Sequence, residues 1–254
     1  MKHSLLMILL LIFLTQVVAQ TPISDAKRYW NLHGVPKFVQ ETECHIYNAI
    51  IADSAEATDC NTVTESLFNP SGNRIRLTET NQINGELLVN KTIATYKDEQ
   101  LISYRHYDKS QQLTKIGVLS YPDTMTRIIT NKNASGEFVG KDILTYDKNG
   151  DWISYTAYDT DDKVFFKAIL SYNDKHQQIM VKKYKGFENK LLEEKHYLYN
   201  DKGFVSVEIE KKPKQIKRTY QYISYDDKGN WLRKVSYEGN KAKKMWYRTI
   251  SYYK

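Results

Sequence analysis

The chain has little of what marks most functional classes. It contains two cysteines, 11 glycines and five prolines in 254 residues. After residue 19 no segment is apolar over the roughly 20 residues that a transmembrane helix needs, so no transmembrane segment is expected in the mature chain. Nucleophile-elbow, zinc-protease, phosphate-loop and dinucleotide-binding motifs are absent. These absences argue against an enzyme, and we expect no cofactor.

The spacing of potential metal ligands also argues against metal chemistry. The histidines after residue 19 are scattered, and Cys44-His45 has no second ligand pair that would complete a four-ligand zinc site. Glu193 and Glu194 are neighbours on a predicted strand, so they face opposite sides of it and form no carboxylate pair. We predict no metal site.

The first residues are typical of a secretory signal. Lys2 precedes an apolar run from Leu5 to Leu14, and Val17-Val18-Ala19 fits a small-residue cleavage site. We predict a signal peptide over residues 1–19, cleavage near Ala19, and a periplasmic or secreted product. Residues 20–34 are predicted to be an N-terminal capping segment that covers the open edge of the first strand, ahead of one domain over 35–254.

The two cysteines, Cys44 and Cys60, lie in the first predicted hairpin, whose strands are Val35–Tyr47 and Asn61–Phe68. In an exported protein an even pair of this kind predicts a disulfide. The loop between the two cysteines is short, and closing it would contribute about 3 kcal/mol to the free energy of unfolding.

What the chain does have is an internal repeat. An aromatic residue recurs at intervals of 25 to 28 residues, preceded each time by a short tract rich in β-branched and aromatic residues, as strands are. In a strand, this aromatic residue shares a face with the residue two positions before it. We call these aromatic residues the anchors: Phe68, Tyr96, Tyr121, Tyr146, Tyr172, Tyr199, Tyr225 and Tyr252.

A turn follows most anchors, as in Tyr146-Asp147-Lys148-Asn149-Gly150. The aspartate can bond its own backbone, and the glycine accepts a positive φ. A second reversal falls about 12 residues later, so each unit is a hairpin, and hairpins must pair edge to edge to be stable. We predict an all-β fold, an antiparallel meander of repeated β-hairpins of ~26 residues with about 15 strands. It would form an open twisted sheet or a curled shell, and closure is left open.

The run Tyr-Asp-x-x-Gly-x-Trp occurs at Tyr146–Trp152 and at Tyr225–Trp231. It resembles the YD repeats of RHS-type proteins, and the likeness extends to uncharacterised secreted bacterial proteins built from such hairpins. The resemblance covers Val35–Lys254, although the copies at Tyr96 and Tyr121 lack the glycine. It implies a β-hairpin repeat that serves as a shell or spacer. The effector domains of RHS proteins have no counterpart in this chain.

Positive charge is confined to the last third of the chain. Lys182–Lys254 holds 19 lysines and arginines against 9 acidic residues, whereas Gln20–Val181 holds 17 against 21. Such lysines often only keep a face solvated and discourage edge pairing. The functional interpretation is a basic patch that binds a polyanion. The densest clusters are Lys211, Lys212, Lys214, Lys217 and Arg218, and then Lys241, Lys243 and Lys244.

Three hypotheses of function follow. The first is an exported, non-enzymatic scaffold or binding module whose basic patch contacts an envelope or extracellular polymer such as an acidic polysaccharide or glycan. The second is a protein–protein interaction factor, inhibitor-like or immunity-like, whose aromatic face contacts another envelope protein. The third is an outer-membrane β-barrel. Lysines on both faces of the predicted strands argue against a barrel in the membrane, because a lysine at the bilayer midplane costs about 2–4 kcal/mol.

Overall fold

The computed structural model describes residues 32–46, 59–83, 86–186 and 188–254, which form 16 antiparallel strands. The predicted signal peptide and residues 20–31 of the predicted capping segment lie outside these ranges. No helix among the described residues is long and apolar enough to cross a membrane. The strands are β1 (Pro36–His45), β2 (Asp59–Phe68), β3 (Arg74–Ile83), β4 (Glu86–Lys97), β5 (Gln100–Tyr107), β6 (Leu113–Ser120), β7 (Thr126–Asn133), β8 (Phe138–Tyr146), β9 (Trp152–Tyr158), β10 (Val164–Tyr172), β11 (Gln178–Lys185), β12 (Lys190–Tyr199), β13 (Val205–Lys212), β14 (Ile216–Tyr225), β15 (Trp231–Glu238) and β16 (Lys241–Tyr252).

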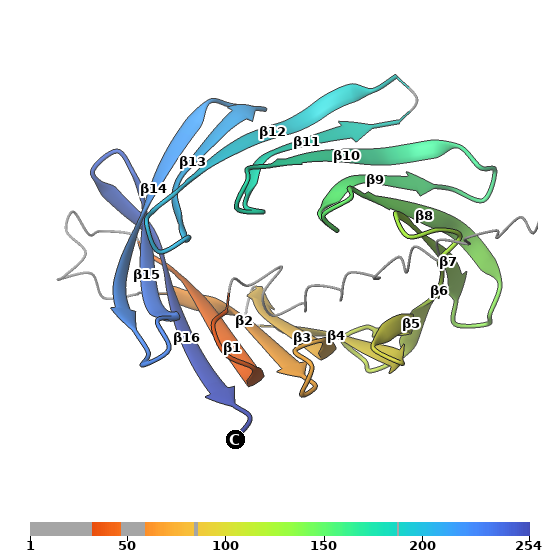
Figure 1. The fold of residues 1–254 in the computed structure, drawn as a ribbon, viewed down its shortest axis with the longest axis horizontal. Coiled ribbons are helices and arrows are strands. Elements are labelled where there is room, and N and C mark those ends of the chain that lie inside the picture. The colour runs from red at the N-terminus through yellow and green to blue at the C-terminus, as the bar shows by residue number, and fades with distance from the viewer. Residues whose placement is uncertain (1–31, 47–58, 84–85, 187) are drawn as a thin grey trace, which may run out of the picture.

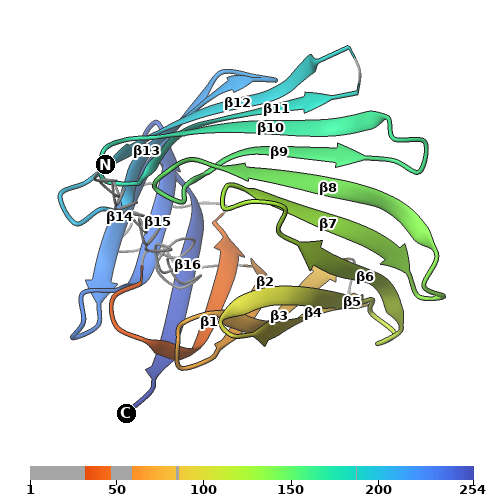
Figure 2. The same cartoon turned by 45° about the vertical axis from the view of Figure 1, so that its right-hand side comes forward.

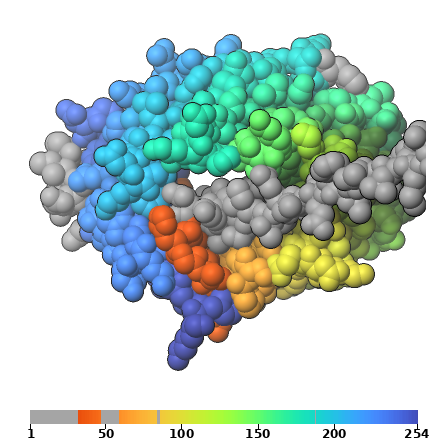
Figure 3. Space-filling view, in the orientation of Figure 1, coloured from red at the N-terminus to blue at the C-terminus, as the bar shows by residue number. Residues whose placement is uncertain are grey.

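Each strand pairs with the next in sequence, and β1 also pairs with β16, so the sheet closes into a barrel (Figures 1 and 2). The antiparallel meander is thereby confirmed, but the expected open sheet or shell is wrong. The right-handed twist accumulates across so many strands, and pairing the two end strands removes both free edges. The edge of β1 is therefore covered by β16. With side chains drawn, the orange and yellow strands lie opposite the cyan strands (Figure 3).

The repeat governs where strands end. Phe68, Tyr146, Tyr172, Tyr199, Tyr225 and Tyr252 are the last residues of six even-numbered strands, as the spacing predicts. Leu170 and its anchor Tyr172 pack in one cluster, which agrees with the predicted shared face. Ile223 is an exception, because the register of β14 shifts between Tyr222 and Tyr225 and Ile223 packs against Val235 and Met245 instead.

Eight turns share one hydrogen-bond pattern. In each, the first residue is Asn or Asp, its side-chain oxygen accepts the backbone N–H four residues on, and its own N–H bonds that residue's carbonyl. The fourth residue has a positive φ, which glycine tolerates best. The turns begin at Asn69, Asp108, Asn133, Asp147, Asp159, Asn173, Asn200 and Asp226.

The tyrosine anchors have a structural reason. The hydroxyl of an anchor donates a hydrogen bond to a backbone carbonyl at the start of the preceding strand, 20 to 22 residues earlier. Phenylalanine could not make this bond. In β14 the same role passes to Tyr222, whose hydroxyl bonds the carbonyl of Val205. The anchors that make it are Tyr96 to Arg74, Tyr121 to Leu101, Tyr172 to Trp152 and Tyr199 to Gln178.

The predicted disulfide is confirmed. Cys44 and Cys60 are bonded, with 3.9 Å between their Cα atoms, and lie opposite each other in the register of β1 and β2. The bond therefore joins the first two strands at the end of the barrel opposite the anchors, where β1 leads into β2.

Candidate binding site in the barrel interior

Alternation along the strands separates an inner face from an outer face. On β14, Arg218, Tyr220 and Tyr222 line two adjoining interior cavities. Because side chains alternate along a strand, Lys217, just before Arg218, and Thr219, just after it, face outward. Directly paired residues on adjacent strands point to the same side of a sheet. The cross-strand register therefore tells which side chains of the neighbouring strands face inward and which face outward.

The larger interior cavity has a volume of about 660 Å³. This lies within the range of small-molecule sites, which are concave, mostly apolar and carry a few polar groups. Its wall runs from β9 to β16 and is unusually aromatic. The rings are Trp152, Tyr172, Tyr197, Tyr199, Phe204, Tyr220, Tyr222, Trp231 and Trp246.

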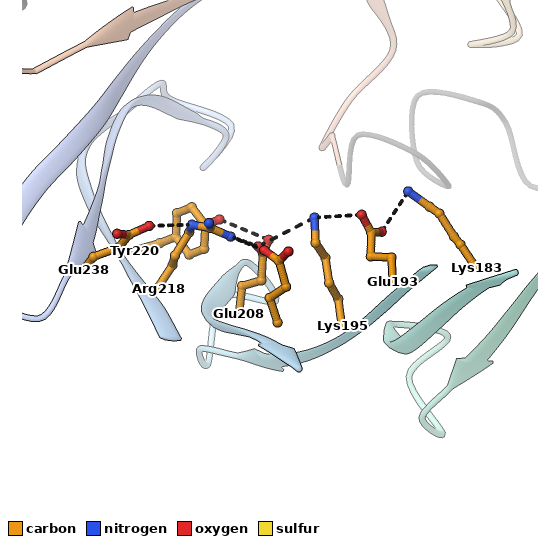
Figure 4. A network of polar contacts seen from close by, with 8 residues as sticks. Lys183, Glu193, Lys195, Glu208, Arg218, Tyr220 and Glu238 are labelled. Atoms are coloured by element: carbon orange, nitrogen blue, oxygen red, sulfur yellow. Dashed lines mark hydrogen bonds and ion pairs between the residues drawn. The ribbon is translucent and has the colours of Figure 1, made fainter. Parts of the chain in front are cut away.

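A second cavity of about 600 Å³ adjoins the first and shares Glu208, Tyr220 and Trp246 with it. Its wall is more polar and includes Arg218, whose guanidinium belongs to a network of polar contacts (Figure 4). Arg218 donates to Glu208 at 2.8 Å, to Glu210 at 2.9 Å and to Glu238 at 3.1 Å. Burial would lower the pKa of Arg218, but Glu210 and Glu208 outweigh it and raise the pKa above its ordinary value.

The network continues along the wall towards β11 (Figure 4). Lys195 lies 3.9 Å from Glu208 and 3.6 Å from Glu193, and Lys183 lies 2.8 Å from Glu193. Burial would raise the pKa of Glu193, but the two lysines outweigh it and hold the pKa below its ordinary value. Cations and carboxylates thus alternate from β11 to β15, so this wall is polar but close to electrically balanced.

The seam between β16 and β1 is built in the same way. Arg248 is 8 % exposed and donates to Glu41 through two nitrogens, at 2.7 and 3.2 Å. Lys244 pairs with Glu43, which also accepts the indole N–H of Trp246 at 2.9 Å. These contacts join residues more than 200 positions apart and fix the register of the closing pair.

Lys234 on β15 differs from its neighbours. Its Nζ lies 4.4 Å from the centre of the Trp231 ring and 4.5 Å from that of Trp246. Within the described part of the chain, no carboxylate lies at ion-pair distance from it. Burial lowers the pKa of Lys234 to about 8, although Glu41 and Glu43 oppose the shift.

Burial raises the pKa of four tyrosines of the cavity, Tyr197, Tyr199, Tyr220 and Tyr222. Burial, and then the charge of Glu208, raises the pKa of Tyr220, and burial raises the pKa of Tyr199 to about 12. The hydroxyl of Tyr220 donates to Glu208 at 3.2 Å. These rings therefore offer apolar faces and hydroxyl groups to a ligand, and they add no charge.

A separate polar cluster fixes the far wall. The buried Asn131 donates to the buried Asp142 at 2.9 Å and accepts the hydroxyl of Tyr104 at 3.1 Å. Tyr104 lies over Gly117, where an added Cβ would come within 2.3 Å of the ring. Burial raises the pKa of Tyr104 to about 12. These groups satisfy one another, so we assign them a structural role.

The residues of the predicted basic patch are divided between the two faces. Arg218 and Lys244 face the interior and are ion-paired. The other six are exposed, and they gather at one end of the barrel, because the β13–β14 and β15–β16 turns both lead from an odd to an even strand. Binding of a polyanion there stays a prediction. The exposed members are Lys211, Lys212, Lys214, Lys217, Lys241 and Lys243.

The prediction for the adjacent glutamates is confirmed. Glu193 bonds the inward Lys183, and Glu194 bonds Lys182 and His196 on the outer face. Sequence reasoning missed Glu208 and Lys234 as interior groups. The alternation of inward and outward side chains along β13 and β15 would have placed Glu208 and Lys234 inside, but only if the inner face of each strand had been known. Across the described ranges, no histidine, cysteine and acidic side chains form a group that could hold a metal ion.

The outer face carries cations along the middle of several strands. One row of directly paired residues crosses β3 to β7 and alternates cation and isoleucine. These residues lie between inward residues such as Tyr104, Gly117 and Asn131, so they face outward. The row is Arg76, Ile93, Arg105, Ile116 and Lys132.

The fold occurs in a solved structure. A porin-like protein from Bacteroides uniformis superposes with a TM-score of 0.56 at 10 % sequence identity, covering 87 % of this chain and 99 % of the other. At that identity the likeness indicates a common fold. No family model matches the chain, and no curated protein matches it by sequence.

Two further matches have TM-scores too low to indicate a common fold. A porin-like protein from Bacteroides vulgatus scores 0.37 at 12 % identity, covering 86 % of this chain and 98 % of the other. The complex TcdB2-TccC3 scores 0.30 at 14 % identity, covering 76 % of this chain and 12 % of the other. The barrel closure, and not these two matches, shows that the identification with YD-repeat proteins is wrong. The chain closes into a barrel like that of the porin-like protein and does not form a YD-repeat shell.

Proposed function

We propose that this chain is an exported, non-enzymatic binding protein that takes a small polar ligand into its barrel. The observation that carries the proposal is the aromatic cavity of about 660 Å³ on the inner wall from β9 to β16. Aromatic faces supply contact area at a low cost in conformational entropy, and hydroxyl and charged groups at the edges set orientation.

The polar groups of the inner wall favour binding over catalysis. Arg218, Glu208 and Lys195 are each engaged in the alternating network, so their charges are already neutralised. A general base needs a free position near a reacting atom, and a nucleophile needs an activating neighbour. Arg218, Glu208 and Lys195 form neither arrangement.

An outer-membrane barrel is the second candidate, and the fold favours it. The matching structure from Bacteroides uniformis is described as porin-like, and both chains are covered almost completely. Strands of 7 to 12 residues also approach the 9–11 that span a bilayer when tilted. In this alternative the inner wall would line an aqueous path across the envelope.

The outer face favours the first candidate. A membrane barrel presents an apolar band about 25 Å tall, and a lysine or arginine at its middle costs about 2–4 kcal/mol. On β3 the outward residues are Arg76, Thr78, Thr80 and Gln82, with no apolar side chain among them. On β12 the outward Glu194 and His196 lie in mid-strand. A face of this composition is suited to water.

Binding inside the barrel can be tested through its tryptophans, because Trp152, Trp231 and Trp246 all line the cavity. We expect a saturable change of intrinsic fluorescence with at least one member of a panel of mono- and disaccharides, nucleosides and amino acids. Val205→Trp should abolish it by filling the cavity. Val207→Trp is the matched control, because Val207 pairs with the exposed, outward Leu198. If no member binds more tightly than about 1 mM, the proposal is wrong.

The two candidates are separated by the behaviour of the refolded protein towards lipid. We expect the purified mature chain to be monodisperse without detergent, to stay in the supernatant when liposomes are pelleted, and to leave planar bilayers non-conducting. Stable co-sedimentation with liposomes together with stepwise conductance would establish the membrane barrel instead.

A further inference from the structure

Lys234 stands apart from the other interior cations of its wall. Lys183, Lys195, Arg218, Lys244 and Arg248 each contact a carboxylate in the described part of the chain. Lys234 lies instead between the rings of Trp231 and Trp246, at 4.4 and 4.5 Å from their centres. Ring faces attract an ammonium group, but they accept none of its three N–H bonds in the directed manner of an oxygen.

The acids near Lys234 are already committed to other cations. Glu41 accepts from Arg248, Glu43 accepts from Lys244 and Trp246, and Glu208 accepts from Arg218. Their charges reach Lys234 at longer range only. A partly buried ammonium with no adjacent anion is unfavourable, and an anionic ligand would relieve it by a charge-assisted hydrogen bond.

The surroundings of Lys234 indicate what the rest of such a ligand would be. Lys234, Trp231, Trp246, Tyr220 and Tyr222 all line the larger cavity. Tyr220 and Trp246 have ring centres 6.2 Å apart, and Tyr222 and Trp231 6.1 Å apart. The walls are therefore flat ring faces with hydroxyl groups nearby. A sugar ring presents C–H groups to a flat face and hydroxyl groups at its edge, which suits such a wall.

We infer that Lys234 binds the carboxylate of an acidic sugar whose rings lie against the tyrosine faces of the cavity. The inference rests on the proposed interior binding function and names its ligand class. Lys234 supplies the charge, Trp231 and Trp246 hold the ammonium in place, and Tyr220 and Tyr222 contact the body of the sugar. A volume of about 660 Å³ accommodates a disaccharide.

The test compares digalacturonic acid with its dimethyl ester, which has the same rings without the charges. Binding is followed by tryptophan fluorescence and isothermal calorimetry in the wild-type protein, in Lys234→Met and in Lys217→Met. Lys217 is the control because it is an exposed, outward lysine on the adjacent strand. We expect Lys234→Met to lower the affinity for digalacturonic acid by about tenfold or more, and Lys217→Met to lower it by less than about twofold.

The pH dependence in the wild-type protein gives a second measurement that needs no variant. Affinity for the acid should fall as the pH rises past about 8, where Lys234 loses its proton. The charged groups around it are Arg248, Glu41, Glu43 and Glu208. Burial raises the pKa of the neighbouring Tyr222, so that hydroxyl does not account for a loss near pH 8.

The outcomes separate this inference from the proposed function. If the wild-type protein binds the ester as tightly as the acid, or Lys234→Met binds the acid as well as the wild type does, Lys234 is not the anion-binding group, while interior binding stands. If neither sugar binds and Val205→Trp changes nothing across the wider panel, both proposals are wrong.

Discussion

Replacing Arg218 with leucine removes the one cation that Glu208, Glu210 and Glu238 share, at 2.8, 2.9 and 3.1 Å. Among the described residues, Glu210 and Glu238 would then have no counter-charge, and Glu208 would keep only Lys195, 3.9 Å away. Breaking a buried ion pair costs roughly 3–5 kcal/mol, whereas an exposed pair is worth at most about 1 kcal/mol. The Arg218 side chain is 24 % exposed, between those limits. We therefore expect the free energy of unfolding to fall by about 2–3 kcal/mol.

The assay is urea unfolding followed by tryptophan fluorescence, with thermal unfolding by circular dichroism alongside. For a chain of this length the melting temperature should fall by about 4–12 °C. Sodium chloride at molar concentration should reduce the difference in melting temperature between the variant and the wild type, because it screens the repulsion among the carboxylates. Adding Glu210→Gln to Arg218→Leu should recover about 1 kcal/mol, because Glu210 is one of the two carboxylates left without a counter-charge.

The control is Lys217→Leu, which removes a cation from the adjacent outward position. We expect it to change the free energy of unfolding by less than about 0.5 kcal/mol. The interior network does not stabilise the barrel if Arg218→Leu changes the free energy of unfolding by less than about 0.5 kcal/mol, or if Lys217→Leu lowers it as much as Arg218→Leu does. Either result would show that the assignment of the network is wrong.

Three further predictions concern the repeat and its turns. Tyr199→Phe should lower the free energy of unfolding by about 1 kcal/mol through the lost bond to a backbone carbonyl, and Tyr225→Phe by less; equal losses in urea unfolding would refute the role of the hydroxyl. Gln111 and Gly229 both have a positive φ at the fourth turn position, and Gly229 has open space around it. Gln111→Gly should therefore raise the free energy of unfolding by roughly 1 kcal/mol and Gly229→Ala should lower it by roughly the same amount, with matching shifts of the melting temperature. Shifts of the same sign for both variants would contradict this explanation. Burial would raise the pKa of Asp226, but the hydrogen bonds that its carboxylate accepts outweigh burial and lower the pKa. Asp226 therefore contributes stability above about pH 4 that is lost as the pH falls. In Asp226→Asn the melting temperature should fall less steeply towards acid pH, and a profile identical to that of the wild type would contradict this role.

The turn chemistry explains both the success and the failure of the sequence interpretation. The run from Tyr146 to Gly150 correctly predicts an anchor, a turn started by aspartate and a new strand, because these are local preferences of five consecutive residues. The same local chemistry serves any antiparallel meander. It therefore could not distinguish a YD-repeat shell from a closed barrel.

The candidate site was harder to predict than the strands. The basic patch was defined by proximity in sequence, yet Arg218 faces the interior while Lys217 faces outward. The side chains of neighbouring residues on a strand point to opposite faces of the sheet, so a dense run of lysines is divided between the two faces. Lys234, between Arg233 and Val235, carries no sign of function in the sequence, and only the structure places Trp231 and Trp246 on either side of it.

The sequence by itself determined the strands, the anchors, the turns and the pairing of Cys44 with Cys60, since each depends on residues close together along the chain. Only the tertiary structure decided that β1 meets β16, through Glu41 with Arg248 and Glu43 with Lys244. Those contacts arise from twist summed over 16 strands, a property of the whole sheet that no short segment encodes. Closure in turn created the inside, and with it the cavity to which we assign the function.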